Sequence, residues 1–219
     1  IQQRRHWLAQ DHSLISKMIA NAMLAEKLQL TALLVQQGKM PTLRLAPLTT
    51  AEKSFQAPLQ KEFAMMAHFF IDEQYRDGNE AASWIEEIQF RAGLKKHISV
   101  NRMLPLYQHY AQLAEQPVDA IEADQFHPDP ASMSEAIRNP IGNVLLETAS
   151  PDFKQYLLRL VHLDARMALL KQLEKTETDN PVNNPWTPGK EDTLTRRDKQ
   201  LCFRHAPDHD RYNSCLPLL

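Results

Sequence analysis

The stretch SPDFKQYLLRLVHLDARMALLKQLEK, residues 150–175, decides the fold class that this sequence predicts. Its apolar residues recur at spacings of 4, 3, 4 and 3, the periodicity of one buried helix face. That face consists of Tyr156, Leu160, Leu163, Met167 and Leu170. Ser150 followed by Pro151 is typical of a helix start, because proline is tolerated at the first helical position. We therefore expect a helix from Ser150 to about Lys175 that packs against other helices.

A second long helix is predicted near the N-terminus, over residues 11–37, with Gly38 where a C-terminal cap belongs. Its expected buried stripe is Leu14, Ile15, Met18, Ile19, Ala22, Ala25 and Leu28. The preceding Arg4-Arg5-His6-Trp7 is basic and aromatic, which is typical of a segment just outside a bilayer. No apolar run of about 18 residues or more occurs, so the sequence predicts no membrane span.

Capping boxes at Thr49-x-x-Glu52 and Ser132-x-x-Glu135 predict two more helix starts. The helix that starts at Thr49 should run to about Arg76 and be kinked or divided by Pro58. Six or seven helices are expected in all. The other predicted elements are a helix over 80–90, a helix from Ser99 or Asn101 to Leu113, a loop over 117–131, and a helix from Pro140 with Asn139 as its N-cap.

The composition changes after Thr178, where Asn-Pro and Pro-Gly pairs mark consecutive turns. Two short apolar segments, residues 193–195 and 201–203, flank a polar turn and predict a small β-hairpin. We therefore expect a mainly α protein: an irregular multi-helix bundle over 1–178, followed over 179–219 by a linker rich in proline and asparagine and a hairpin tail packed on the bundle.

Both cysteines, Cys202 and Cys215, lie in this tail. Two cysteines confined to one irregular tail favour a disulfide that closes a short loop, worth roughly 3 kcal/mol in the chain-entropy model. The alternatives are two free thiols, or a zinc site that includes His205 and His209. A disulfide would indicate an oxidising compartment.

The composition excludes several classes of function. The chain has 219 residues, a net charge of −2 and only 5 glycines, with no dinucleotide-binding or P-loop motif. This balanced charge does not predict nucleic-acid binding. Neither HExxH nor GxSxG occurs, so no metalloprotease or hydrolase motif is present, and we expect no cofactor.

Two groups of residues are candidate sites. His162 and Asp164 could form a catalytic pair, although a carboxylate beside an apolar helix face more often pairs with an arginine from another helix. His205, Asp208 and His209 could hold a divalent cation, although a solvated polar loop explains them as well.

Three stretches resemble a pattern in uncharacterised proteobacterial envelope proteins that carry one N-terminal membrane helix. They are Ser99–Tyr107, then Asn139–Leu146 with Tyr156 and Asp164 downstream, and finally Asn184–Gly189 with Leu201–Phe203. The resemblance implies a periplasmic domain on an inner-membrane anchor, and it implies no activity and no catalytic residue.

These observations lead to a functional hypothesis: a non-enzymatic envelope interaction or scaffold domain, tethered upstream of Ile1, whose partners are other envelope proteins. Membrane contact would be made only by a segment outside this chain. One alternative is a hydrolase with an unrecognised helical active site. Another is a carrier that encloses an apolar ligand among Phe63, Met66, Phe69 and Phe70.

Overall fold

The computed structural model describes residues 1–10, 13–41, 45–71, 92–149, 152–173, 181–187, 189–205 and 214–219. The chain is mainly α-helical with a small C-terminal antiparallel sheet, which confirms the predicted fold class. The helix predicted over 80–90 lies outside the described residues. The described helices are α1 (Gln2–Gln10), α2 (Leu14–Gln36), α3 (Thr50–Lys53), α4 (Gln56–Ile71), α6 (Lys96–Leu113), α7 (Val118–Ala123), α8 (Met133–Arg138), α9 (Pro140–Ala149) and α10 (Phe153–Leu170).

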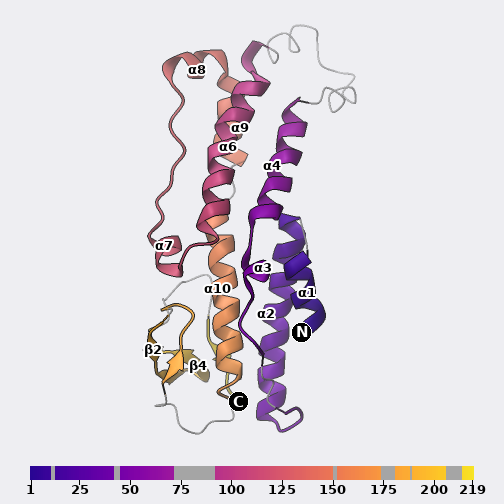
Figure 1. The fold of residues 1–219 in the computed structure, drawn as a ribbon, viewed down its shortest axis with the longest axis vertical. Helices are drawn as coiled ribbons and strands as arrows, with labels where there is room; N and C mark the ends of the chain where they lie inside the picture. Colours follow the sequence, from indigo (N-terminus) through magenta and orange to yellow (C-terminus); the bar gives the residue numbers. More distant parts are fainter. Residues whose placement is uncertain are drawn as a thin grey trace.

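The helices form an elongated bundle in which α10 occupies the middle (Figure 1). Helix α2 packs along one side of α10, while α7 and the C-terminal strands contact α10 from other directions. Helices α4 and α6 pack side by side in the upper half, where α9 also contacts α6. Helix α10 is therefore in contact with both the helical bundle and the C-terminal strands.

The predicted apolar face of α10 is confirmed. Leu160, Leu163, Met167 and Leu170 are at most 3% exposed, and Tyr156 is partly buried. The predicted start is wrong, because the helix begins at Phe153 and the Asp152 carboxylate accepts the N-terminal hydrogen bond. Burial extends well beyond that face, since α10 is enclosed by neighbours on several sides.

The predicted buried stripe of α2 is wrong in part. Leu14 and Leu28 are buried, but Ile15 and Ile19 are 63% and 54% exposed, and Lys17 is 1% exposed. The reason is α1, a helix that the sequence patterns did not indicate, which packs on α2 and covers Lys17 instead. In the described residues, α2 is also the one helix long and apolar enough to cross a membrane, although part of its surface lies in the bundle core.

The capping box at Thr49 and the division of the following helix are confirmed. Helix α3 ends at Lys53 and α4 begins at Gln56, so Pro58 lies in the first turn of α4. This is the part of a helix where a missing N–H costs nothing, because first-turn N–H groups have no partner inside the helix. The chain therefore divides just before the proline.

Helix α6 begins at Lys96, so the prediction that Ser99 or Asn101 caps it is wrong. Ser99 is fully buried inside the helix and accepts a hydrogen bond of 3.0 Å from the amide of Asn139. The side-chain oxygen Oδ1 of Asn139 in turn accepts from the Lys95 N–H at 2.6 Å. Gly142 of α9 lies directly over this contact, and a Cβ there would collide with both side chains. Gly142 therefore permits the close approach of α9 to α6.

Two other predictions concern the same region. The start of α9 at Pro140 and the capping box at Ser132 are confirmed. The predicted loop over 117–131 is wrong at its beginning, because α7 forms at Val118–Ala123. Val118 and Ile121 bury one short face of α7 against the core, and its helical contacts are with α10.

The predicted C-terminal hairpin is confirmed. Strands β3 (Leu194–Arg197) and β4 (Gln200–Phe203) pair around a two-residue turn. Asp198 and Lys199 have positive φ values of 44° and 59°, the conformation of a type I′ hairpin turn. Strand β5 (Leu216–Pro217) pairs with β4, and a disulfide joins Cys202 to Cys215, as predicted.

A second small sheet was not predicted. It consists of β1 (Val182–Asn183) and β2 (Glu191–Asp192), which pair antiparallel. The two strands are only two residues long, too short for an alternating pattern to be recognised in the sequence. We call residues 181–205 and 214–219 the C-terminal module.

Candidate functional site

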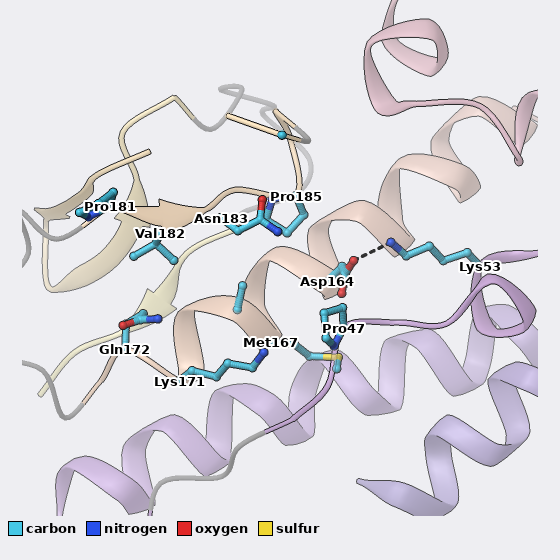
Figure 2. A pocket seen from close by; sticks show the side chains of 12 residues that line it. Pro47, Lys53, Asp164, Met167, Lys171, Gln172, Pro181, Val182, Asn183 and Pro185 are labelled. Carbon is cyan, nitrogen blue, oxygen red and sulfur yellow. Dashed lines mark ion pairs between the residues drawn. The ribbon is translucent and has the colours of Figure 1, made fainter. Parts of the chain in front are cut away.

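A groove lies beside α10, between this helix and the C-terminal module (Figure 2). Its volume is about 420 Å³, within the range of ligand-binding pockets. Side chains from the second half of α10 and just after it line one side together with Pro47, and residues of the C-terminal module line the rest. Most of the described residues that line it are apolar, and three of them are charged: Lys53, Asp164 and Lys171. We call it the α10 groove.

Asp164 is the one carboxylate among the described residues that line the α10 groove, and it is 4% exposed. One of its oxygens accepts from the ammonium of Lys53 at 2.6 Å, as drawn in Figure 2. The other accepts from the Leu48 N–H at 2.9 Å. The expected pairing of Asp164 with a basic residue from another helix is therefore found, but the partner is a lysine rather than an arginine. Lys53 keeps 43% of its side chain exposed.

The Pro47 wall of the groove is held in place by Arg5 of α1. The Arg5 guanidinium donates to the carbonyls of Ala46 and Pro47 at 2.7 and 2.9 Å. It also makes two bonds to the Glu52 carboxylate at 2.5 and 2.6 Å. These bonds give Arg5 a structural role. One of the basic residues in the stretch Arg4-Arg5-His6-Trp7 is therefore explained by contacts within the protein.

The Arg5–Glu52 pair is reflected in the pKa values of both groups. Burial alone would raise the pKa of Glu52, but hydrogen bonds from Arg5 and Thr49 bring it below its usual value. The hydrogen bond to Glu52 raises the pKa of Arg5. Both groups therefore stay charged at neutral pH, and the segment that carries Pro47 is tied to α1 and α3.

A second hollow of about 140 Å³ lies next to the groove along α10. Lys53, Asp164 and Pro185 line both hollows, so these residues stand between the two. The second hollow is otherwise lined mainly by apolar residues from α10 and from α7 with the turn before it: Ala114, Pro117, Val118, Ile121, Leu157, Leu160 and Val161.

The structure does not bring His162 and Asp164 together as a catalytic pair. His162 is 4% exposed, and its Nδ1 lies 2.5 Å from the Ser214 hydroxyl. Its ring packs edge-on against Trp186, which also donates a hydrogen bond of 3.1 Å to Ser214. Residues two apart in a helix point to different sides. His162 therefore joins α10 to the C-terminal module, while Asp164 lines the groove.

Among the described residues, His205 pairs with Asp192. Its Nδ1 lies 2.7 Å from the Asp192 carboxylate, which is 3% exposed. That carboxylate also accepts from the Asn184 amide and from the N–H groups of Thr193 and His205. The other proposed ligands, Asp208 and His209, lie outside the described residues, and within the described residues no three potential metal ligands come together.

Sequence patterns did not indicate several residues that line the α10 groove. Lys53 follows a capping-box glutamate and Lys171 follows an apolar helix, and neither position carries a motif. Pro181 and Pro185 were recognised only as turn residues, which is a local property. Their shared position in the groove depends on how the C-terminal module packs on α10.

Replacing Asp192 with asparagine should lower the free energy of unfolding by about 1–2 kcal/mol at pH 7, because a buried acceptor of several hydrogen bonds loses its charge. Burial alone would raise the pKa of Asp192, but bonds from His205, Thr193 and Asn184 hold it below its usual value. A lowered folded-state pKa gives stability that is present above the unfolded value, near 3.9, and lost as the pH falls through the folded value.

The difference in stability between wild type and Asp192→Asn should therefore shrink below about pH 4. Urea unfolding at pH 7, 5 and 3 measures it, with the exposed Asp119→Asn as the matched control. A difference that stays constant over this range would contradict the assignment of stability to the charged carboxylate.

Comparisons with known proteins add no family to this description. No protein-family model matches the chain, and no curated protein or solved structure matches it either.

Proposed function

We propose that this protein is a non-enzymatic interaction domain of the cell envelope, which holds a segment of a partner protein in the α10 groove. The observation that carries the proposal is the groove itself, a hollow of about 420 Å³. The described residues that line it are mostly apolar, and the carboxylate among them, Asp164, is already held by protein groups. Such a lining suits recognition by apolar contact.

The bonding of Asp164 argues against the hydrolase alternative. A general base must be able to take a proton from substrate or water, so its oxygens must be accessible in the reactive state. In this protein one oxygen of Asp164 accepts from Lys53 and the other from the Leu48 N–H, so both oxygens are already engaged by protein groups. His162, the partner expected for it, is engaged by Ser214 elsewhere.

The packing of α4 argues against the carrier alternative, in which Phe63, Met66, Phe69 and Phe70 enclose an apolar ligand. Phe70 is 4% exposed, whereas Phe69 is 52% exposed, so these neighbouring rings face different surroundings. Phe63 packs against Tyr107, with ring centroids 5.5 Å apart. The aromatic residues of α4 thus do not share one environment.

The disulfide supports an oxidising compartment, which we take to be the periplasm. The resemblance to anchored envelope proteins adds an inner-membrane tether outside residues 1–219. Helix α2 serves the core of the domain, since Leu24 and Leu28 are fully buried in it.

Photo-crosslinking in intact cells of the native host tests the proposal. A benzoylphenylalanine in place of Gln172, which lines the groove, should give a discrete adduct with one envelope protein. The same substitution at Gln108, which is exposed on α6, should not give that adduct. Equal labelling from both positions, no adduct from position 172, or turnover of peptidoglycan, ester or phosphoester substrates by the purified protein would each reject the proposal.

A further inference from the structure

We propose that α1 is a latch on the α10 groove: it detaches while the rest of the fold stays intact, and its detachment frees the segment 45–54. Two residues of that segment, Pro47 and Lys53, line the groove. This inference concerns a motion within the protein and does not depend on the proposed function. Three observations support it: how α1 is attached, what its departure leaves behind, and what Arg5 holds in place.

Helix α1 is attached to the bundle mainly through two of its side chains. It lies on the outside of the bundle, against α2 and α3 (Figure 1). Six of its nine residues are exposed, and Leu8 is the one that is fully buried. A helix of this length is not stable in water by itself, because helices shorter than about 12–15 residues are marginal without packing. The attachment of α1 therefore depends on the burial of Leu8 and on the bonds of Arg5.

The departure of α1 leaves neither of the two charges beneath it without a partner. The Lys17 ammonium loses the Leu8 carbonyl, but it keeps the Ser54 carbonyl at 2.6 Å. The Glu52 carboxylate loses its guanidinium partner, but it keeps the bonds from the Thr49 N–H and hydroxyl at 2.7 and 2.9 Å. Both charges also become open to water, which solvates them. Detachment of α1 should therefore cost less than global unfolding, as is usual for elements with few buried apolar contacts.

Arg5 connects α1 to the groove wall. Its guanidinium donates to the carbonyls of Ala46 and Pro47 at 2.7 and 2.9 Å, and no other donor within the described residues bonds to them. The N–H that follows Pro47, that of Leu48, donates to the Asp164 carboxylate at 2.9 Å. The wall segment thus has polar attachments to α1 on one side and to α10 on the other. When α1 detaches, the first of these attachments is lost.

Native-state hydrogen exchange of the purified, oxidised protein, read by NMR, tests this inference. In wild type we expect the amides of α1 to exchange roughly a hundredfold faster, or more, than those in the middle of α10. Replacing Arg5 with alanine should speed the exchange of the Leu48 and Lys53 amides about tenfold or more, because the bonds that protect both amides loosen with the wall. The amides of α10 should exchange as in wild type, because the core stays folded.

Arg4→Ala is the matched control, because it removes a guanidinium from the same helix. Arg4 lies over the Trp7 ring of α1, 4.0 Å from its centre, and makes no bond to the wall segment within the described residues. It should leave the exchange of the Leu48 amide unchanged. Arg5→Lys keeps the charge beside Glu52, but one ammonium cannot replace all four bonds of the guanidinium, so its effect should be intermediate.

Three results would overturn the inference. Exchange of α1 at the rate of the α10 amides would show that α1 leaves only on global unfolding. Faster exchange of α1 in Arg5→Ala with no change at Leu48 would show that the wall is not coupled to α1. Equal effects of Arg4→Ala and Arg5→Ala would show that the lost charge, and not the bonds of Arg5, is responsible.

The inference stays testable if Arg5→Ala does not fold, because Arg5→Lys then takes its place with the same expected order of amides. None of these results bears on the adduct from position 172, so the latch and the proposed function can fail separately.

Discussion

Replacing Lys17 with alanine should lower the free energy of unfolding by about 3 kcal/mol, because two buried carbonyls lose their donor and a long aliphatic stem leaves the core. Lys17 lies on the buried face of α2 and is 1% exposed. Its ammonium donates to the Leu8 carbonyl at 2.9 Å and to the Ser54 carbonyl at 2.6 Å.

These two carbonyls explain why a lysine is tolerated in the core. Leu8 lies in the last turn of α1, and Ser54 is the C-cap residue that follows α3. The last carbonyls of a helix have no partner within it and lie at the negative end of its dipole. The ammonium of Lys17 therefore supplies donors to two helix ends, and it lies 5.3 Å from the centre of the Phe55 ring.

Urea unfolding followed by circular dichroism measures the effect, with two comparison variants. Lys27→Ala removes an exposed lysine from the same helix and should change the stability by less than about 0.5 kcal/mol. Lys17→Met keeps most of the buried stem and should recover part of the loss. Equal stabilities for Lys17→Ala and Lys27→Ala would show that the buried ammonium contributes nothing to the fold.

Removing the disulfide by the double substitution Cys202→Ser and Cys215→Ser should cost about 3 kcal/mol, the value that loop-closure entropy gives for a loop of this size. The two cysteines are 13 residues apart, and the bond holds β5 against β4. Strand β5 is only two residues long, although Leu216 is fully buried. Other contacts at this end are the bonds from the Gln36 side chain to the Pro217 carbonyl and the Leu219 N–H, and the bond from the Leu218 N–H to the Lys199 carbonyl.

Removing the disulfide should also disturb the α10 groove. Ser214 precedes Cys215 and accepts the hydrogen bond from Trp186, which lies beside the groove residue Pro185. We therefore expect weaker crosslinking from position 172 in the double variant. Wild type treated with a reductant should show the same loss of stability as the double variant. An unchanged unfolding midpoint in either case would contradict the role given to the bond.

The state of the cysteines can be measured directly on protein from its own host. Alkylation before and after reduction, read by mass, should label neither cysteine at first and both after reduction. Free thiols in the native protein would remove the main support for an oxidising compartment and direct attention to metal binding near His205.

Local patterns in the sequence determined much of the secondary structure. The apolar period of α10, the capping boxes at Thr49 and Ser132, and the start of α9 at Pro140 all depend on residues within a few positions of one another. The hairpin and the disulfide are also local, since both join residues close together in the chain. Features of this kind can be predicted because their physical causes are contained in a short window.

The tertiary structure decided which faces are buried and where the site lies. Lys17 is inside and Ile15 is outside because α1 and Ser54 provide acceptors at one particular face of α2. Asp164 lines a groove with Lys53, and His162 faces Ser214, because segments distant in sequence pack on different sides of α10. The Lys17–Leu8 bond joins residues 9 positions apart, and each of the other contacts joins residues at least 37 positions apart. Only folding brings such residues together, so no periodicity or motif in the chain predicts them.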